Sequence, residues 1–495
     1  MTMANNFRTP GVYIEEVSKF PPSVVAVETA IPAFIGYTAK TRSKGTNLLN
    51  RPVAVNSMLE FDEIFGSARS VGGFVVTVDA DGKVIGGISD PNAGTSARFR
   101  MAYSLRHFYD NGGGRCYVVS IGDYTASAVL SDMVSAHLAG LSALATEDEP
   151  TLIVFPDLSA MAPSDASPAA AATVRAKYHS VLMQALNQCA TLGDRFLICD
   201  LLDGDQAGKA GLEAFRNGIG TRNLKYGAVY HPFIQTTLPW LWDPDTITVT
   251  QLALRKDDGT ITQPSPYNGM TLAKLKSGDP NNSAIPANPT IYANISRELD
   301  RYSVVLPPAA AIAGVYTTVD NTRGVWKSPA NESLASVRAL TVDIDKDMND
   351  EMNVDTTGKS VNALRYFTGK GFLVWGARTL AGNDNEWRYV SVRRFFNMVE
   401  ESVTKASQPF VFEPNDANTW VKVRSMIENF LVVQWRQGAL AGAKPEDAFY
   451  VRVGLGTTMT AQDILEGNMN VEIGMAVVRP AEFIILRFSH KMQEA

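Results

Sequence analysis

The sequence is poor in the residues that cross-links and metal sites need. Among its 495 residues are three cysteines, Cys116, Cys189 and Cys199, which lie far apart and are odd in number. This spacing disfavours a disulfide framework and favours buried thiols in a reducing compartment. The five histidines form no HExxH pair and no close ligand set, so we expect no metal site.

Charge is also scarce. Charged residues make up 19% of the chain, and 45 Lys and Arg against 51 Asp and Glu give a net charge of −6. Without a basic excess, neither nucleic acid nor an anionic membrane is an expected partner. The first residues lack the apolar run of a secretory signal, and the most apolar later stretch, Ser303–Tyr316, is too short to span a bilayer. We therefore expect no direct membrane insertion.

The middle of the chain alternates strands with helices. Short apolar runs at Leu152–Phe155, Phe196–Cys199 and Tyr226–Tyr230 are typical of buried strands, and Thr173–Leu192 has helical spacing with Gly193 as its stop. Such alternation favours a parallel sheet with right-handed crossovers. The fold class predicted from the residues is α/β, mixed with α+β features.

Other segments surround this α/β region. Asp81-Gly82 predicts a hairpin between Phe74–Val78 and Val84–Ile88, whereas Leu238–Asn294 has no sustained period and is interpreted as projecting loops and short strands. Further strands are expected at Ile31–Tyr37, Cys116–Ile121, Phe449–Val453, Val471–Val478 and Phe483–Ser489, and further helices at Ala97–Tyr109, Ser391–Lys405 and Asn418–Gln437.

Sites for phosphate and calcium are disfavoured. The glycines of Asn111–Arg115 follow a helix and lead into a strand, the reverse of the order in a phosphate loop, and Gly204–Ala210 lacks the glycine spacing and the hydroxyl of a Walker loop. Asp343, Asp345 and Asp347 have EF-hand spacing, but the glycine and the glutamate that this loop requires are missing. No cofactor is predicted.

One group of residues resembles an enzyme site. Asp157, Asp200 and His231 each follow a predicted α/β strand, and ligands bind at the carboxyl ends of such strands. Acidic residues at strand ends are also ordinary turn-formers and helix caps, so a structural role is the favoured interpretation. By elimination, the chain is predicted to be a structural or assembly protein with no catalytic residues.

Blocks at both ends of the chain closely resemble the contractile tail sheath proteins of bacteriophages and of phage-tail-like injection systems. They cover about half of the chain and include PGVYIEEV at Pro10–Val17, PAFIG at Pro32–Gly36, FYDNGGGRCYVV at Phe108–Val119, AGVYTTVDNTRGVWKSPAN at Ala313–Asn331, NALRYFTGKGFLVWGARTL from Asn362, FEPND at Phe412–Asp416 and VEIGMAVVRPAEFIILRFS at Val471–Ser489.

The resemblance implies an inner α/β domain, made from the C-terminal third and the N-terminal strand, with insertions that project outward. The expected segments are an N-terminal arm and linker at 1–30, a first α/β segment at 31–125, a middle or outer region at 126–360, an inner sheath domain at 361–478 and a C-terminal arm at 479–495.

In such proteins the arms add strands to the sheets of neighbouring subunits. The expected N-terminal contact residues are Pro10, Gly11, Val12, Tyr13, Ile14, Glu15 and Val17; the C-terminal ones are Phe483, Ile484, Ile485, Leu486, Arg487, Phe488 and Ser489; the hinges are Pro21, Pro22, Arg479 and Pro480. β-rich segments at chain ends fit this scheme, because unpaired strand edges are otherwise an aggregation hazard.

The resemblance further implies a subunit of a helical sheath of stacked rings that contracts around a rigid inner tube. Expected partners are further copies of the chain, the inner tube protein, the baseplate and a tail terminator or cap, with assembly in the bacterial cytoplasm and release on lysis as one route out. Two alternatives stay open: a hydrolase- or transferase-like enzyme centred on Asp157, Asp200 and His231, and a type VI secretion sheath component.

Overall fold

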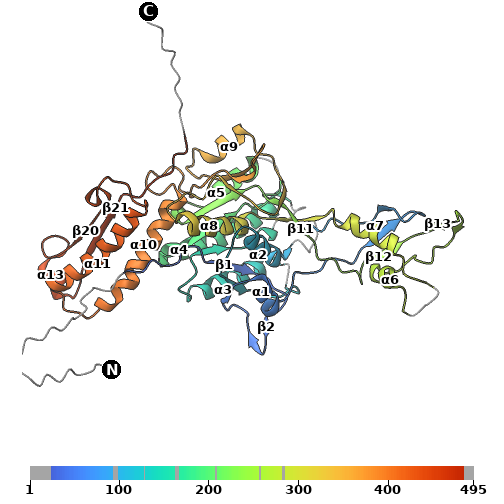
Figure 1. Cartoon of the computed structure of the whole chain (residues 1–495), viewed down its shortest axis with the longest axis horizontal. Helices are drawn as coiled ribbons and strands as arrows, with labels where there is room; N and C mark the ends of the chain where they lie inside the picture. Colours follow the sequence, from blue (N-terminus) through green and yellow to red (C-terminus); the bar gives the residue numbers. More distant parts are fainter. Residues whose placement is uncertain are drawn as a thin grey trace, which may run out of the picture. The chain divides into compact units, whose positions relative to one another are not determined.

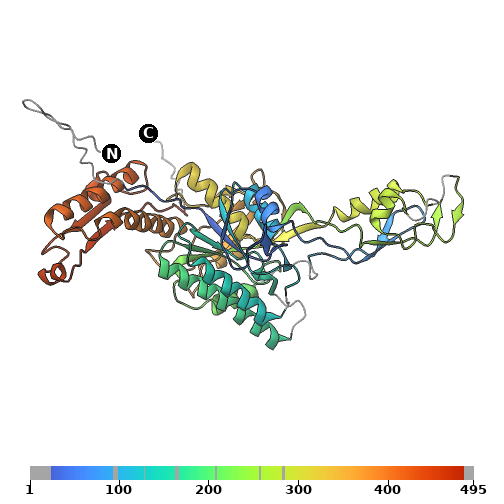
Figure 2. The same ribbon diagram turned by 90° about the horizontal axis from the view of Figure 1, so that it is seen from below.

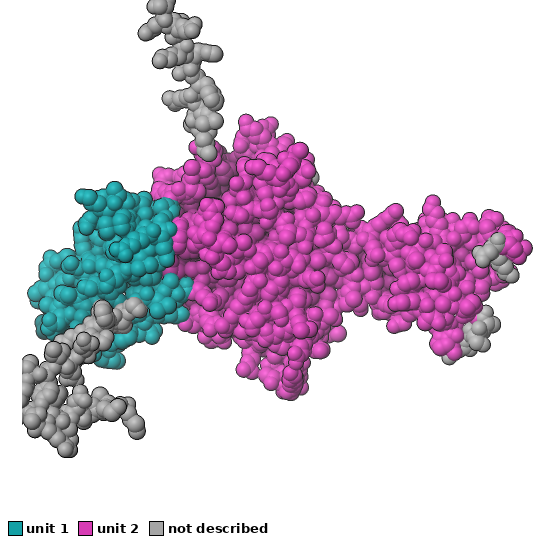
Figure 3. All heavy atoms as spheres, viewed as in Figure 1, with its two compact units in different colours: residues 1–27, 401–478 teal, residues 28–400, 479–495 magenta. Residues whose placement is uncertain are grey.

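The chain folds into two compact units. The computed structural model describes residues 24–92, 98–126, 129–161, 167–206, 209–255, 258–280 and 285–483. Unit 1 comprises the chain up to Val27 together with Glu401–Val478, and unit 2 comprises Glu28–Glu400 and the residues from Arg479 onward (Figure 3). The resemblance implies an inner domain that starts at residue 361. Unit 2 continues to Glu400, and the strands that follow residue 361 belong to its sheet.

Unit 2 is built on one nine-stranded sheet, which confirms the predicted α/β class (Figure 1). The six central strands run parallel, and antiparallel strands complete both edges. In spatial order the strands are β16 (Glu332–Ser333), β19 (Gly371–Val374), β18 (Asn362–Phe367), β10 (Gly227–His231), β9 (Phe196–Asp200), β8 (Leu152–Val154), β1 (Pro32–Gly36), β7 (Cys116–Ser120) and β4 (Val53–Val55).

Helices cover both faces of this sheet, because its central strands are apolar on both sides. In β1, Ala33 and Ile35 point into one core and Phe34 into the other. The first core includes residues of α3 (Leu130–Leu144), α4 (Pro168–Leu192) and α5 (Lys209–Gly218); the second includes residues of α1 (Met58–Phe65), α2 (Met101–Asp110) and α8 (Ala309–Arg323). No described helix is long and apolar enough to cross a bilayer.

The apolar stretch Ser303–Tyr316 divides at its two prolines into a strand and a helix. β15 (Ser303–Leu306) lies before them and α8 begins after Pro308. β15 pairs with β11 (Ile234–Pro239), which also pairs with β17 (Val337–Leu340).

α9 (Lys346–Asn353) begins at the EF-hand-like aspartates, where the Asp345 side chain accepts a hydrogen bond from the Met348 N–H and caps the helix.

The predicted hairpin at Asp81-Gly82 is confirmed, and it belongs to a lobe with its own core inside unit 2. β5 (Val75–Val78) pairs with β6 (Val84–Gly86) on one side and with β12 (Thr248–Thr250) on the other. The region read as loops contributes β12, β13 (Leu254–Arg255), β14 (Ile261–Thr262), α6 (Leu272–Ser277) and α7 (Pro289–Leu299). Figures 1 and 2 show this lobe set apart from the nine-stranded sheet.

Unit 1 contains a hairpin packed on a long helix. α10 (Val390–Ser407) passes from unit 2 into unit 1, and α11 (Ala417–Arg436) buries Val423, Ile427 and Phe430, part of the stripe that the sequence predicted. The remaining elements are α12 (Pro445–Ala448), β20 (Phe449–Val453), α13 (Ala461–Leu465) and β21 (Val471–Met475).

Candidate assembly site

The hairpin formed by β20 and β21 is the candidate site for joining subunits. Its register pairs Phe449 with Met475, Val451 with Ile473 and Val453 with Val471. In β20, Phe449 and Val451 are buried whereas Tyr450 and Arg452 are exposed, so the inward and outward residues alternate as expected for a strand with one covered face.

The hairpin sheet has two strands in the part of the chain that the structure describes. The Ala476 N–H donates to the Ala448 carbonyl, which makes the even-numbered β21 residues the inward hydrogen-bonding set. The N–H groups of Val451 and Ile473 therefore point away from the hairpin. In β21, Val471, Ile473 and Met475 are only half-buried. Both features suit a sheet that receives further strands.

Most residues of the expected arms lie outside the described residues. The N-terminal set Pro10–Val17, the hinge prolines Pro21 and Pro22, and the C-terminal residues 484–489 are among these. Phe483 is described, and its side chain is 71% exposed. Of the second expected hinge, Arg479 is exposed and Pro480 half-buried, and neither lies in a helix or strand.

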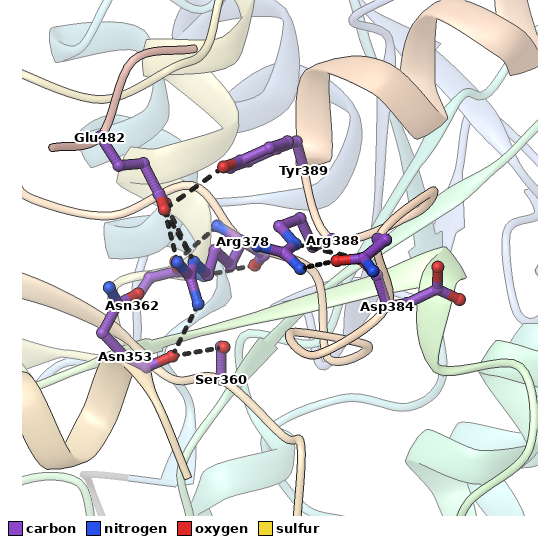
Figure 4. A network of polar contacts seen from close by, with 9 residues as sticks. Asn353, Ser360, Asn362, Arg378, Asp384, Arg388, Tyr389 and Glu482 are labelled. Carbon is purple, nitrogen blue, oxygen red and sulfur yellow. Dashed lines mark hydrogen bonds and ion pairs between the residues drawn. The ribbon is translucent and has the colours of Figure 1, made fainter. Parts of the chain in front are cut away.

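The start of the C-terminal arm is fastened to unit 2 by an ion pair that sequence reasoning missed. The Arg378 Nε donates to the Glu482 Oε1 at 2.9 Å, and the Tyr389 hydroxyl donates to Oε2 of the same carboxylate at 3.4 Å (Figure 4). The Arg378 side chain is 4% exposed, and its Nη1 donates to the Asn353 carbonyl. The Glu482 carboxylate raises the pKa of Arg378 by stabilising its cation.

Arg378 is itself held by its backbone. Its N–H donates to the Asn362 Oδ1 at 2.8 Å, and its carbonyl accepts from the Asn362 Nδ2 at the same distance. Asn362 is the first residue of β18, so these two hydrogen bonds attach the Arg378 backbone to the central sheet. The sequence separation of 104 between Arg378 and Glu482 explains why no local sequence pattern pointed to the pair.

Asp157, Asp200 and His231 do lie at the same end of the sheet. They stand at or after the carboxyl ends of β8, β9 and β10, which are parallel neighbours. Asp157, however, is fully buried and accepts hydrogen bonds from the backbone N–H groups of Tyr37, Arg100 and Met101. Burial raises the pKa of Asp157 to about 7, although the three amides and the Arg100 guanidinium act in the opposite direction. Asp157 therefore caps the start of α2.

Asp200 and His231 have similarly structural surroundings. The Asp200 Oδ1 accepts from the Ala309 N–H at 2.8 Å, at the first residue of α8, and burial raises its pKa to about 7. His231 is 2% exposed, and burial lowers its pKa to about 4. Two carboxylates that accept hydrogen bonds from helix amides support the favoured structural role over a reaction centre, and they show that this role is helix capping.

These features define a class of protein: one whose polar strand ends cap helices and whose separate hairpin sheet has two strands within residues 24–483 that the structure describes. The sequence of this chain also matches a model of a known protein family. Residues 382–491 match the model of the phage tail sheath C-terminal domain.

The chain is 30% identical to a chain of the anti-feeding prophage helical sheath in its contracted state, covering 98% of this chain and 100% of that one with a TM-score of 0.62. A chain of the anti-feeding prophage baseplate is also 30% identical over 98% of this chain and 100% of its own, with a TM-score of 0.61. The tail sheath protein of Vibrio phage KVP40 is 27% identical over 147 residues, which are 28% of this chain but 21% of that relative. The chain belongs to the family of contractile tail sheath proteins, which confirms the predicted resemblance.

Proposed function

We propose that this chain is the subunit of a contractile sheath that polymerises as a helical tube around a rigid inner tube and contracts to drive that tube through a target envelope. The open hairpin of β20 and β21 is the observation that carries the proposal. Likeness to a contracted sheath over 98% of the chain supports it.

The arms complete the hairpin of neighbouring subunits by β-augmentation. Pro10–Val17 and Phe483–Ser489 are β-rich, and the outward N–H groups of Val451 and Ile473 offer one edge on each side of the hairpin. Each copy then donates strands to others and receives strands in turn. A head-to-tail contact of this kind does not close, so it produces a helical polymer.

Contraction then moves each subunit between two lattices as a nearly rigid body, while the segments at Pro21-Pro22 and Arg479-Pro480 act as hinges. The process needs no nucleotide. The free-energy difference between the lattices is stored at assembly and released after the baseplate triggers, and small gains at many interfaces add along the polymer.

The partners that follow from this function are the inner tube protein, the baseplate and a terminator or cap, besides further copies of the chain. The subunit is made and assembled in the bacterial cytoplasm, and the finished tail or tail-like particle leaves the cell on lysis. The likeness to a chain from a baseplate assembly supports the baseplate contact.

Electron microscopy of purified variants tests the arm model. Deletion of Met1–Phe20, or replacement of Ile484–Phe488 by polar residues, is expected to leave a folded monomer that forms no tubes. Replacement of Ile85 and Leu252, exposed apolar residues of the lobe, by serine is the matched control and should leave polymerisation intact. Normal tubes from either arm variant would refute the model.

The enzyme alternative predicts a small discrete species whose activity is lost in Asp200→Ala. The capping contact of Asp200 with Ala309 instead predicts loss of stability in that variant. A type VI sheath is built from two chains, whereas both arm segments and the hairpin occur in this one chain. This difference favours the single-chain type.

A further inference from the structure

The chain passes between the two units three times, at 27/28, 400/401 and 478/479. On the unit 2 side of each crossing, a buried arginine holds the chain, and all three arginines, Arg378, Arg393 and Arg394, belong to one stretch of 17 residues. We propose that all three are positioning residues, which fix where the connections to unit 1 and the C-terminal arm leave unit 2. The inference rests on the proposed function for its role in the sheath.

At the C-terminal crossing, two fastened residues lie close together in sequence. The Val478 N–H donates to the Ala439 carbonyl inside unit 1, and Glu482 binds Arg378 inside unit 2. Residues 479–481 are all that separate them. Three extended residues span about 10 Å, so the connection is short, and the arm that follows starts from unit 2.

At the N-terminal crossing, Arg394 has the corresponding role. Its Nη1 donates to the Asp320 Oδ1 at 3.0 Å, and its Nη2 donates to the Thr29 carbonyl at 2.8 Å. The Thr29 hydroxyl donates to the same aspartate at 2.6 Å. On the unit 1 side, the Val27 N–H donates to the Ser402 Oγ. One residue, at position 28, therefore separates the contact of Val27 within unit 1 from the contacts of Thr29 within unit 2.

The third crossing lies within α10 itself. The Arg393 Nη2 donates to Glu400, the last residue of unit 2, at 2.9 Å, and its Nε donates to the Asn397 Oδ1 at 2.7 Å. The Arg393 guanidinium also lies 4.4 Å from the centre of the Trp387 ring. These contacts stiffen the helix just before it enters unit 1.

The choice of partners argues for positioning rather than for core stability. A buried guanidinium loses its hydration, and pairing it seldom gains more than an apolar replacement would. For two of the three arginines the acid is at the rim and the arginine inside, because the side chains of Glu400 and Glu482 are 49% and 21% exposed. Asp320, the acid that Arg394 binds, is 4% exposed. Such pairs select one location for the rim residue, and here the rim residues are next to the crossings.

The test uses the full-length monomer, so it does not depend on polymerisation. Nitroxide labels on Phe483→Cys and Glu386→Cys, both exposed residues of unit 2, report the position of the arm by electron–electron double resonance. The native Cys116, Cys189 and Cys199 are buried and stay unlabelled. With Glu482→Gln added, we expect the distance distribution to become about twice as broad, because the arm loses its only charged anchor among the described residues.

Thr29→Val and Glu472→Gln complete the design. Thr29→Val removes the hydroxyl that contacts Asp320 and should speed hydrogen exchange of the Val27 amide about tenfold without changing exchange in β9 or β10. Glu472→Gln, the same change on β21, should leave both measurements unchanged. Unchanged label distances in Glu482→Gln, or faster exchange throughout unit 2, would overturn the inference. A wild-type chain that forms no tubes would refute the proposed function while leaving these monomer measurements valid.

Discussion

The Asp157 carboxylate accepts a hydrogen bond from the Tyr37 backbone N–H at 2.7 Å, across 120 residues of sequence. Two further amides, from Arg100 and Met101, donate to the other oxygen. The side chain thereby joins the end of β1, the end of β8 and the start of α2. Gly36 is required beside it, because a Cβ there would lie 2.4 Å from the Asp157 Oδ2.

Removal of this carboxylate should destabilise unit 2. Asp157→Ala leaves three buried amides without an acceptor, which we expect to cost about 3 kcal/mol or more in the free energy of unfolding. Asp157→Asn keeps one acceptor oxygen, so its free energy of unfolding should lie between those of Asp157→Ala and the wild type. Urea denaturation measures both, with the exposed Asp245→Ala as control. An Asp157→Ala protein as stable as wild type would show that the amides are satisfied in another way.

The sequence predicted the strands of this region but not the hydrogen-bond partners of the polar residues at their carboxyl ends. Three predicted strands are parallel neighbours as expected: Leu152–Phe155, Phe196–Cys199 and Tyr226–Tyr230. Their uninterrupted apolar runs are typical of strands buried on both faces of a sheet. The donors that reach Asp157 come from distant segments, and no local pattern encodes them.

Two helices of the lobe were also missed. α7 carries Ile291, Ile295 and Leu299 at intervals of four residues, a helical signal that the surrounding Pro and Asn residues obscured. α6 has six residues, too few for a period to be recognised. In the apolar stretch Ser303–Tyr316, Pro307 and Pro308 separate a strand from a helix.

Two helical glycines should respond to alanine with opposite signs. Gly314 of α8 lies against α2, where a Cβ would meet the Phe108 carbonyl oxygen at 2.6 Å, so Gly314→Ala should cost about 2 kcal/mol through overpacking. Gly211 of α5 has open space around it, so Gly211→Ala should gain about 0.5 kcal/mol from helix propensity. Thermal unfolding of the two variants tests this contrast, and equal shifts would contradict the close approach of α2 and α8.

His137 should make unit 2 sensitive to acid. The ring is buried, its Nδ1 lies 2.7 Å from the Met133 carbonyl, and burial lowers its pKa to about 4. The unfolded chain, with a His pKa of about 6.5, binds the proton first, so this contribution to stability is complete above pH 6.5 and is lost as the pH falls toward 4. The loss amounts to about 3 kcal/mol.

The variant His137→Asn isolates this term because its side-chain amide can still donate to Met133 but does not titrate. We expect the stability advantage of the wild type over the variant to shrink between pH 7 and pH 4.5, as measured by urea denaturation at each pH. Asp157 and Asp200 are present in both proteins, so their own titrations cancel from the difference. A difference that stays constant over this range would mean that His137 keeps an ordinary pKa.

A proline on the outer edge of β21 should separate folding from assembly. The Ile473 N–H points away from β20, so Ile473→Pro removes a donor that the hairpin itself does not use. Ile473→Ala removes the side chain but keeps that N–H and is the matched control. Both monomers should give the same far-ultraviolet circular dichroism, whereas only the alanine protein should form tubes under electron microscopy. If the proline protein polymerised as readily as the alanine protein, the β21 edge would not receive a neighbour's strand, and the proposal that both edges of the hairpin are completed by arms would be wrong.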